Sequence, residues 1–314
     1  MPTGLPAGQR LPEQIVYNGA MTTNAPTADR SQRFLFDNAD IRGETVHLHD
    51  SLGEVLANHQ YAPGVGRLLG EFMAASVLLT TTLKYEGKMI LQARSEGQIP
   101  LIMAECTSDL KIRAIARGAQ EATAEAFDVL LNNGQLVITI DPARGERYQG
   151  IVPLVKNSLA HSLDAYFRMS EQLHTRFWLA CDGQQAAGML LQQLPSQLQP
   201  DPQDRANQWQ HVCTLADTVR DEELLALPAE QSLRRLFHEE PTRLFEARRP
   251  QFHCSCSRER TFNALTAVGA EEVESLLVEQ GSITMDCEFC NQQYAFYRED
   301  LLALLQPESP PLMH

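Results

Sequence analysis

The sequence predicts an α+β protein with three parts: an N-terminal domain that combines a mixed or antiparallel sheet with packed helices, a helical linker, and a small C-terminal zinc-binding domain. Runs of alternating apolar residues, which favour strands, share residues 89–193 with helical patterns. Residues 203–248 are highly charged and have helical periodicity but no strand pattern. Four cysteines in two closely spaced pairs follow near the C-terminus, an arrangement typical of zinc sites.

The composition sets the limits of these parts. With 314 residues, of which 43% are hydrophobic, the chain can bury a sizeable core and divide into two or three domains. Breakers and small polar residues dominate the first thirty positions, so we expect order to begin near Phe34, with Met21 as an alternative start. The expected segments are a disordered tail at 1–32, an α+β core domain at 33–202, a metastable helical linker at 203–248 and the zinc-binding domain at 249–314.

Two helices and then a run of strands are expected in the first half of the core domain. The run Ser51–Glu54 matches a capping box and predicts a helix through His59, and a second helix covers about 65–83 with its apolar residues on one face. Short turns at 96–97 and 108–109 separate the strands after them, so the sheet is at least partly antiparallel. The four expected strands are Met89–Arg94, Leu101–Glu105, Leu110–Arg117 and Leu136–Ile140.

The second half of the core domain is also expected to combine strands with a helix. A strand near Arg147–Val155 leads into a helix near Ser158–Leu173. Two further strands, Arg176–Ala180 and Ala187–Gln193, lie on either side of a Cys-Asp-Gly turn and indicate a hairpin.

His47 and His49 alternate as neighbours on a strand would. No third ligand type lies near them in sequence, so we expect a solvated strand face rather than a metal site.

Residues 203–248 contain 6 basic and 9 acidic side chains, with prolines between short helical patterns. The expected helices are Trp209–Val219, Glu222–Leu227 and Gln231–His238, and none is long enough to be stable alone. We therefore expect this linker to fold only by docking on the core. The apolar residues expected to make that contact are Leu215, Val219, Leu224, Leu225, Leu233, Leu236 and Phe237.

The C-terminal segment carries the chemistry. Cys254 and Cys256 form a C-x-C pair, and Cys287 and Cys290 form a C-x-x-C pair 30 residues later. A turn can bring such pairs together as a tetrahedral four-thiolate zinc site, and the uncommon C-x-C arm suggests a site with more than a structural role. The elements expected around the pairs are helices at Arg258–Thr266, Glu271–Glu279 and Asp300–Leu305 and a strand near Gln293–Tyr297.

Charged neighbours are expected to modulate this site. Asp286 and Glu288 add negative charge beside the second pair, and Arg258 and Arg260 offset part of it near the first. Without a metal, four thiolates at this spacing repel each other and take up protons.

The expected compartment favours a metal over permanent disulfides. The first thirty residues contain no apolar run behind a basic start, and no stretch of 18 apolar residues occurs, so we expect a cytoplasmic protein without a membrane partner, whose thiols stay reduced. The other three cysteines, Cys106, Cys181 and Cys213, have apolar neighbours and are expected to be inert core thiols.

The charge argues against a nucleic-acid partner. The formal net charge is −14, and residues 249–314 contain 4 basic and 10 acidic side chains. A zinc ribbon that binds nucleic acid needs a basic surface, which this segment does not have.

Several motifs together resemble one family. The run C-S-C-S-R-E-R from Cys254, the acidic run at 271–274, and C-E-F-C from Cys287 followed by Tyr294 and Phe296 are similar to the 33 kDa chaperonin family, the redox-regulated heat-shock holdases of bacteria. The similarity covers roughly residues 33–306, and a longer N-terminal tail is its clear departure. Upstream motifs that contribute to it are Gly145–Gly150, Ser170–Leu173, Ala187–Gln192 and Glu222–Pro228.

This resemblance implies an ATP-independent holdase, not an enzyme, that binds unfolded client proteins. It implies one Zn²⁺ per chain on Cys254, Cys256, Cys287 and Cys290 while the protein is reduced and inactive. It further implies that hypochlorite, or peroxide with heat, forms the disulfides Cys254–Cys256 and Cys287–Cys290 and releases zinc. The zinc-binding domain then acts as a redox-switch domain, because it unfolds together with the linker. The active form is then expected to be a homodimer.

The residues supply a physical reason for such a switch. Structural zinc contributes roughly 10–16 kcal/mol to the folding of small domains, and it would tie Cys254 to Cys290 across the whole segment. Disulfides within each pair close loops of only three and four residues, which remove little entropy from the unfolded chain. One long-range link through zinc is replaced by two local disulfides, so the C-terminal segment should unfold and the linker should unfold after it.

Two other functions remain as alternatives. A structural zinc ribbon accounts for the four cysteines equally well, and C-x-x-C is also the motif of thiol–disulfide oxidoreductases. That motif belongs at a helix N-terminus after a strand, whereas Cys287 and Cys290 are expected in a turn near the chain end. Zinc release coupled to suppressed aggregation indicates the holdase, turnover as an insulin reductase indicates the enzyme, and neither indicates the ribbon.

Overall fold

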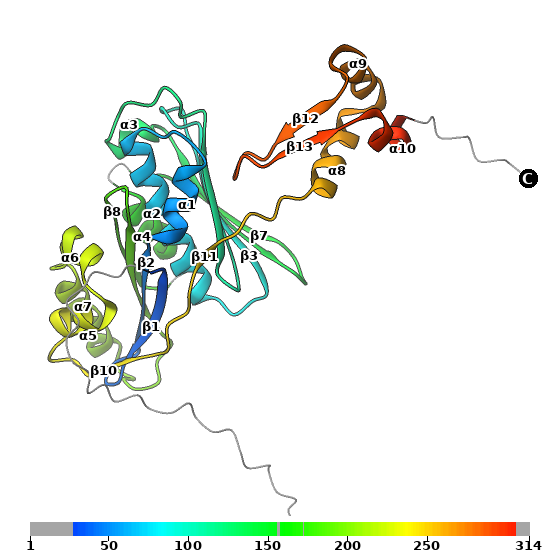
Figure 1. Ribbon diagram of the computed structural model, residues 1–314. Coiled ribbons are helices and arrows are strands. Elements are labelled where there is room, and N and C mark those ends of the chain that lie inside the picture. Colours follow the sequence, from blue (N-terminus) through cyan, green and yellow to red (C-terminus); the bar gives the residue numbers. More distant parts are fainter. Residues whose placement is uncertain (1–27, 156–157, 172, 306–314) are drawn as a thin grey trace, which may run out of the picture.

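The computed structural model describes residues 28–155, 158–171 and 173–305. Two largely antiparallel sheets enclose one long helix, further helices cover the outer face of the first sheet, and the C-terminal segment lies on the side of the second sheet (Figure 1). The α+β prediction is confirmed. Most of the tail predicted at 1–32, including Met21, lies outside the described residues.

The first sheet is fully antiparallel, with strand order β10-β1-β2-β9-β8. Its last two strands are the hairpin expected around residues 181–183. The strands are β1 (Arg30–Phe36), β2 (Ile41–Leu48), β8 (Thr175–Cys181), β9 (Ala186–Gln193) and β10 (Thr242–Leu244).

The second sheet has the order β11-β5-β4-β3-β6-β7, in which β11 pairs parallel to β5 and all other pairs are antiparallel. The five core strands expected between residues 89 and 155 are all present here. They are β3 (Gly87–Arg94), β4 (Leu101–Thr107), β5 (Lys111–Arg117), β6 (Gln135–Pro142) and β7 (Tyr148–Pro153), joined by β11 (Gln251–Phe252).

Helix α2 (Pro63–Thr82) fills the space between the two sheets. It is apolar on nearly every face, which is the pattern of a helix with neighbours all round, and it matches the helix expected at 65–83. Its side chains share one core cluster with both sheets. The remaining core helices are α1 (Asp50–Ala57), α3 (Phe127–Leu130) and α4 (Leu159–Tyr166), which continues as a π-helical turn at Phe167–Glu171.

The start of the core differs from the prediction. Order is present from residue 28, and β1 and β2 form a hairpin that the sequence analysis did not assign. The capping box at Ser51 was wrong, because the carboxylate of Asp29 caps α1 instead. It accepts hydrogen bonds from the backbone N–H groups of His49, Asp50 and Ser51 at 2.7–2.9 Å.

The helices of residues 203–248 pack on the outer face of the first sheet (Figure 1). They are α5 (Pro202–Ala216), α6 (Asp221–Ala226) and α7 (Ala229–Leu236). Phe237 packs edge-on against Phe36 with 5.0 Å between the ring centroids. We call the contact the linker face; its linker side is Val212, Ala216, Leu224, Leu225, Leu233, Leu236 and Phe237, and its sheet side is Phe34, Phe36, Ala39, Ile41, Ala180, Ala187, Met189 and Leu191.

Two expectations about this region were wrong. Residues 242–244 form the short strand β10 beside β1, although no strand pattern was recognised there, because the partner strand supplies the pairing. His47 is buried rather than solvated, and its Nε2 lies 2.9 Å from the carbonyl oxygen of Leu224 in α6.

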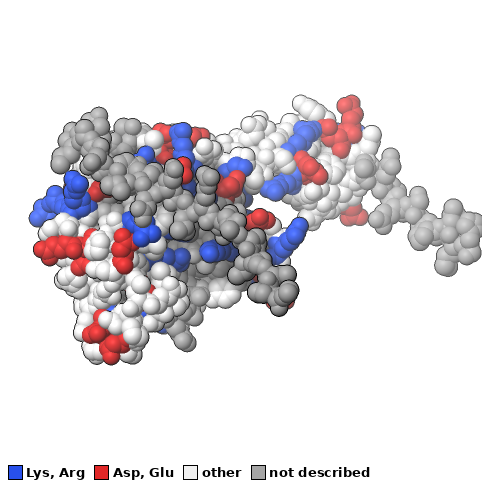
Figure 2. All heavy atoms as spheres, turned by 90° about the horizontal axis from the view of Figure 1, so that it is seen from below, with Lys and Arg blue, Asp and Glu red and all other residues white. Residues whose placement is uncertain are grey.

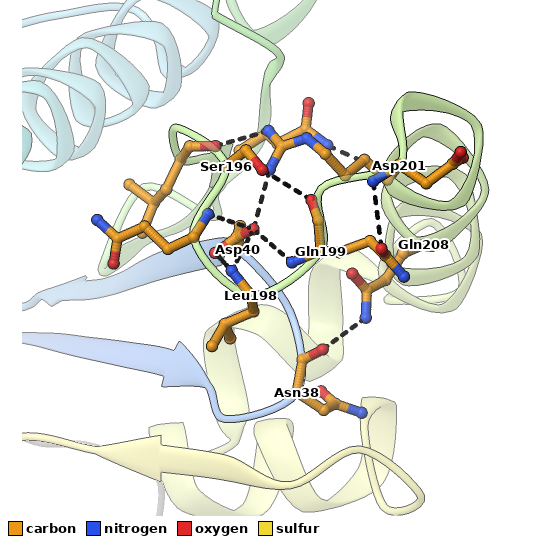
Figure 3. Close-up of polar contacts among 11 residues, drawn as sticks. Asn38, Asp40, Ser196, Leu198, Gln199, Asp201 and Gln208 are labelled. Carbon is orange, nitrogen blue, oxygen red and sulfur yellow. Dashed lines mark hydrogen bonds and ion pairs between the residues drawn. The ribbon is translucent and has the colours of Figure 1, made fainter.

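Asp40 anchors the chain segment just before α5 (Figure 3). Its carboxylate accepts hydrogen bonds from the backbone N–H groups of Gln197, Leu198 and Gln199 and pairs with Arg205 at 2.9 Å. Burial raises the pKa of Asp40, but these hydrogen bonds and the charge of Arg205 outweigh it and hold the pKa below its ordinary value. The start of the linker is thereby tied to the turn between β1 and β2.

The C-terminal segment has a small core of its own. Phe296 is its largest fully buried side chain. The elements are α8 (Arg258–Val268), α9 (Ala270–Gln280), β12 (Ile283–Asp286), β13 (Gln293–Phe296), a 3-10 turn (Arg298–Leu301) and α10 (Leu302–Leu305). Of these, only β12 was not expected. Among the described residues, no helix combines the length and the apolar character needed to cross a membrane.

Candidate metal centre

The four predicted cysteines lie together. Their sulfur atoms are all within 4.8 Å of one another, with Cys254 3.6 Å from Cys287 and Cys256 3.5 Å from Cys290. A tetrahedron with metal–sulfur bonds of about 2.3 Å has edges of about 3.8 Å, so the cluster has the size of a four-thiolate zinc site. Both of these contacts join the C-x-C arm, Cys254 and Cys256, to the C-x-x-C arm, Cys287 and Cys290, as expected for one common centre.

Local structure places both arms. Cys254 and Cys256 lie in the extended stretch between β11 and α8, just before Ser257, whose side chain caps α8 by accepting the N–H of Arg260. Cys287 and Cys290 lie in the turn of the β12–β13 hairpin. That turn closes through the N–H of Cys287, which donates to Gln292.

The electrostatics of the cluster call for a cation. Burial, and then hydrogen bonds with the other cysteines, raise the pKa of Cys290, and the backbone N–H of Gln292 only partly opposes this. The hydroxyl of Tyr294 donates to Cys256 at 3.2 Å, and this hydrogen bond raises the pKa of Tyr294 to about 12, so the hydroxyl keeps its proton. Because a protonated thiol is a poor metal ligand, a bound divalent cation would displace protons here. Four sulfur donors favour zinc over magnesium or calcium.

A basic side chain of the core reaches the first arm, which the sequence analysis missed. Arg113 of β5 donates from Nη1 to the sulfur of Cys254 at 3.8 Å. The two arginines expected to offset charge here bond elsewhere: Arg258 with Ala295 and Asp300, and Arg260 with Ser255.

The second arm also contacts the core. The ring of Phe289 lies under the guanidinium of Arg113, 4.0 Å from its central carbon. His59 Nε2 lies 2.8 Å from the carbonyl oxygen of Glu288, whose carboxylate pairs with Arg117. Asn291 donates to the carbonyl of Asn58. Both cysteine pairs are thus held against β5 and the end of α1.

The three other cysteines stand outside the cluster. Cys106 and Cys213 are buried and Cys181 is half-buried. Burial raises the pKa of each to about 12, which keeps the thiols protonated and unreactive at neutral pH. Among the described residues, the four C-terminal cysteines are the one group of three or more possible metal ligands.

The surface charge is mixed. On the face drawn in Figure 2, basic and acidic side chains are interspersed over the core and the C-terminal segment. This arrangement differs from the continuous basic stripe of nucleic-acid-binding domains.

Comparisons with known proteins agree with one another. The family model described as Hsp33 protein matches residues 29–297. The 33 kDa chaperonin of Pseudomonas paraeruginosa PA7 is 53% identical over 280 residues, which are 88% of this chain and 94% of that protein. The 33 kDa chaperonin of Ectopseudomonas mendocina ymp is 53% identical over 279 residues, 88% of this chain and 95% of that protein.

A solved structure shares the fold. The crystal structure of the 33 kDa chaperonin, a heat shock protein 33 homolog, from Thermotoga maritima superposes with a TM-score of 0.74. The two chains are 22% identical, and the match covers 88% of this chain and 97% of that one.

Proposed function

Since the chain belongs to the Hsp33 family of 33 kDa chaperonins, a family of chaperones and not of enzymes, we propose that it is an ATP-independent holdase whose activity is switched on by oxidation of its C-terminal cysteines. The alternative of a thiol–disulfide oxidoreductase is thereby set aside. One observation carries the proposal: the cysteine cluster and the linker face lie in consecutive segments of the chain, so a change at the first can reach the second.

In the reduced state, Cys254, Cys256, Cys287 and Cys290 would hold one zinc ion. The bound zinc supplies a cationic centre that keeps the sulfurs as thiolates and joins the two arms. Tyr294 and Arg113 donate hydrogen bonds to two of these sulfurs and fix their orientation. The linker helices meanwhile cover the apolar outer face of the first sheet, so the protein offers little surface to a client.

Oxidation then removes the zinc that joins the two cysteine pairs. In the pairing we propose, Cys254 bonds to Cys256 and Cys287 bonds to Cys290. For each disulfide, the two sulfurs lose two electrons to one hydrogen peroxide molecule, whose O–O bond breaks and which takes up two protons to become two water molecules. Disulfide sulfurs are poor metal ligands, so the segment keeps only its small apolar core and should unfold.

Unfolding of this segment should release the linker. Strand β11, on β5, and strand β10, on β1, are short and belong to one continuous stretch of chain, which connects the linker to the cysteine arms. Once the arms detach, this stretch loses its anchor and the short linker helices have only the linker face to hold them. Exposed apolar surface on the sheet and linker would then bind unfolded clients, in a form that we propose to be a homodimer.

The reduced thiols that this scheme needs are maintained in the cytoplasm, which we propose as the compartment. The acidic charge and the mixed surface support clients that are proteins and not nucleic acids.

The test combines two readings on one sample. Reduced protein should contain one zinc per chain and fail to suppress aggregation of a heat-denatured client. After treatment with peroxide at elevated temperature, zinc should appear in solution and aggregation should be suppressed at stoichiometric chaperone concentration.

The variant with Cys106, Cys181 and Cys213 all replaced by Ala is the matched control, and it should keep both zinc and switching. Loss of zinc in this variant would contradict the ligand assignment. Zinc release without suppression of aggregation would leave a structural zinc ribbon as the better account.

A further inference from the structure

Arg113 occupies an unusual position between the core and the cysteine cluster. It lies on β5 directly opposite Glu105 on β4, and both side chains are largely buried, with 16% and 12% of their surfaces exposed. Arg113 Nε and Nη2 lie 2.8 and 2.7 Å from the same carboxylate oxygen of Glu105. This pairing fixes the plane and direction of the guanidinium.

The free side of that guanidinium faces the C-terminal segment. Nη1 donates to the sulfur of Cys254 at 3.8 Å, and the ring of Phe289, between Cys287 and Cys290, stacks at 4.0 Å from the central carbon. One core side chain therefore touches both arms of the cluster. Arg117, four residues further along β5, pairs with the exposed carboxylate of Glu288, and among the described residues it donates to no sulfur.

We propose that Arg113 is a positioning residue of the redox switch, which holds the cysteine cluster on β5 while Cys254 is a thiolate and releases it once Cys254 is oxidised. This inference rests on the proposed function, because it assigns the residue through which oxidation loosens the contact with the core.

The physical reason is the change in the charge of one atom. A thiolate accepts a charge-assisted hydrogen bond from a guanidinium, whereas a disulfide sulfur is neutral and a weak acceptor. When Cys254 and a second cysteine form a disulfide, two electrons pass to peroxide, which leaves as two water molecules after taking up two protons. Arg113 then keeps Glu105 but loses its charged partner in the C-terminal segment.

The contribution of this contact to the redox equilibrium can be measured. A group that binds the reduced form more strongly than the oxidised form favours reduction, and its removal must favour oxidation by the same factor. Replacing Arg113 should therefore make the disulfide that contains Cys254 form more readily. An arginine whose contact does not involve the charge of Cys254, such as Arg117 in its exposed pair with Glu288, would shift the midpoint only by the small stability of that contact.

The experiment compares Arg113→Met with Arg117→Met in the full-length protein. Redox midpoints are read by thiol alkylation and mass spectrometry in glutathione buffers at a fixed free zinc concentration. For Arg113→Met the oxidation equilibrium should shift threefold to tenfold toward the disulfide, at most about 30 mV more negative for a two-electron couple. Arg117→Met should shift the midpoint less than twofold, because it removes only an exposed ion pair, and Arg113→Lys, which keeps the charge, should recover part of the shift.

Hydrogen exchange supplies a second reading in the reduced protein. The amide of Gln251 donates to the carbonyl of Leu110, just before β5, and the amide of His253 donates to Ile112 in β5, so both report whether β11 is docked. They should exchange at least threefold faster in Arg113→Met than in Arg117→Met. The double variant Glu105→Gln, Arg113→Met should behave in the same way, and it keeps the test valid if the unpaired Glu105 disturbs the core.

Identical midpoints and exchange rates in the Arg113→Met and Arg117→Met variants would overturn the inference. Client aggregation is measured separately. An oxidised wild-type protein that does not suppress it contradicts the proposed function, while the midpoint and exchange comparisons still decide the role of Arg113.

Discussion

Neither the linker nor the C-terminal segment is stabilised by a large apolar core of its own, but the two regions differ in what else holds them. Seven of the nine buried apolar residues of the linker belong to a cluster shared with the first sheet, and the described linker residues form no separate cluster. The C-terminal segment has its own cluster of six buried residues and touches the core through β11 and a few polar contacts around the cysteines. The linker packs on the face beneath it, whereas, in the function we propose, the segment depends on the zinc that joins its two cysteine pairs.

In the function we propose, this difference lets one chemical event control a large apolar surface. A side chain such as Leu or Phe contributes about 1.5–3 kcal/mol when it is fully buried, so the linker face represents a substantial reserve of stability. Cysteine chemistry cannot act on that face directly, because the sulfurs lie elsewhere. In the proposed switch, it acts on the C-terminal segment that holds the end of the linker, and the linker helices are too short to remain folded without their contacts.

The largest expected effect comes from weakening the linker face while the cysteines stay reduced. Replacing Phe237 by Ala should cost about 3–5 kcal/mol, since the ring is buried against Phe36 and Phe34. Partial holdase activity should then appear with zinc still bound. Both tryptophans of the chain, Trp178 and Trp209, lie at the edge of this face, so their fluorescence reports linker release during urea titration.

The exposed Leu198 provides the control for this variant. The Leu198→Ala protein should behave as the wild type in both assays. If Phe237→Ala lowers the urea midpoint but remains inactive until oxidised, release of the linker is not sufficient for activity.

A smaller effect is expected at the junction between core and linker. Asp40→Ala removes the acceptor of three backbone N–H groups and leaves Arg205 without its ion pair, for a loss of about 1–3 kcal/mol. The tryptophan transition should move to lower urea, and the rate of zinc loss from the reduced protein should not change. A faster loss of zinc would show that linker docking and zinc binding do not depend on separate contacts.

The smallest effect is a pH dependence of linker docking. Burial lowers the pKa of His47 below its ordinary value of 6.5, more than the hydrogen bond to Leu224 raises it. The released linker state therefore binds more protons, so docking loses stability as the pH falls below 6.5. His47→Gln keeps a donor for Leu224 but does not titrate. Its tryptophan transition should be flat between pH 7 and 5.5 while the wild-type midpoint falls, with zinc content checked in both proteins.

Local patterns in the sequence predicted much of this arrangement, and long-range contacts account for what it missed. The periodicity of α2, the hairpin of β8 and β9, and the grouping of the four cysteines follow from spacing alone. The two-residue strand β11 exists only because β5 offers a free edge. Asp29 caps a helix about twenty positions away, and this contact leaves no local signal.

Arg113 shows where a prediction was within reach and where it was not. The turn expected at residues 108–109 places Glu105 and Arg113 on adjacent strands, one register position from facing each other, and the observed three-residue turn 108–110 brings them directly opposite. Nothing in the spacing connects Arg113 with Cys254, 141 positions later. That contact depends on how the C-terminal segment lies on the core, which only the folded structure reveals.

The central claim is that the linker stays folded only while the cysteine centre is reduced, and hydrogen exchange of reduced and oxidised protein tests it most directly. In oxidised, zinc-free protein we predict lost protection throughout residues 203–305 and retained protection in the strands between residues 30 and 193, together with suppression of client aggregation. Oxidised protein that suppresses aggregation while residues 203–248 keep the protection of the reduced form would contradict this account.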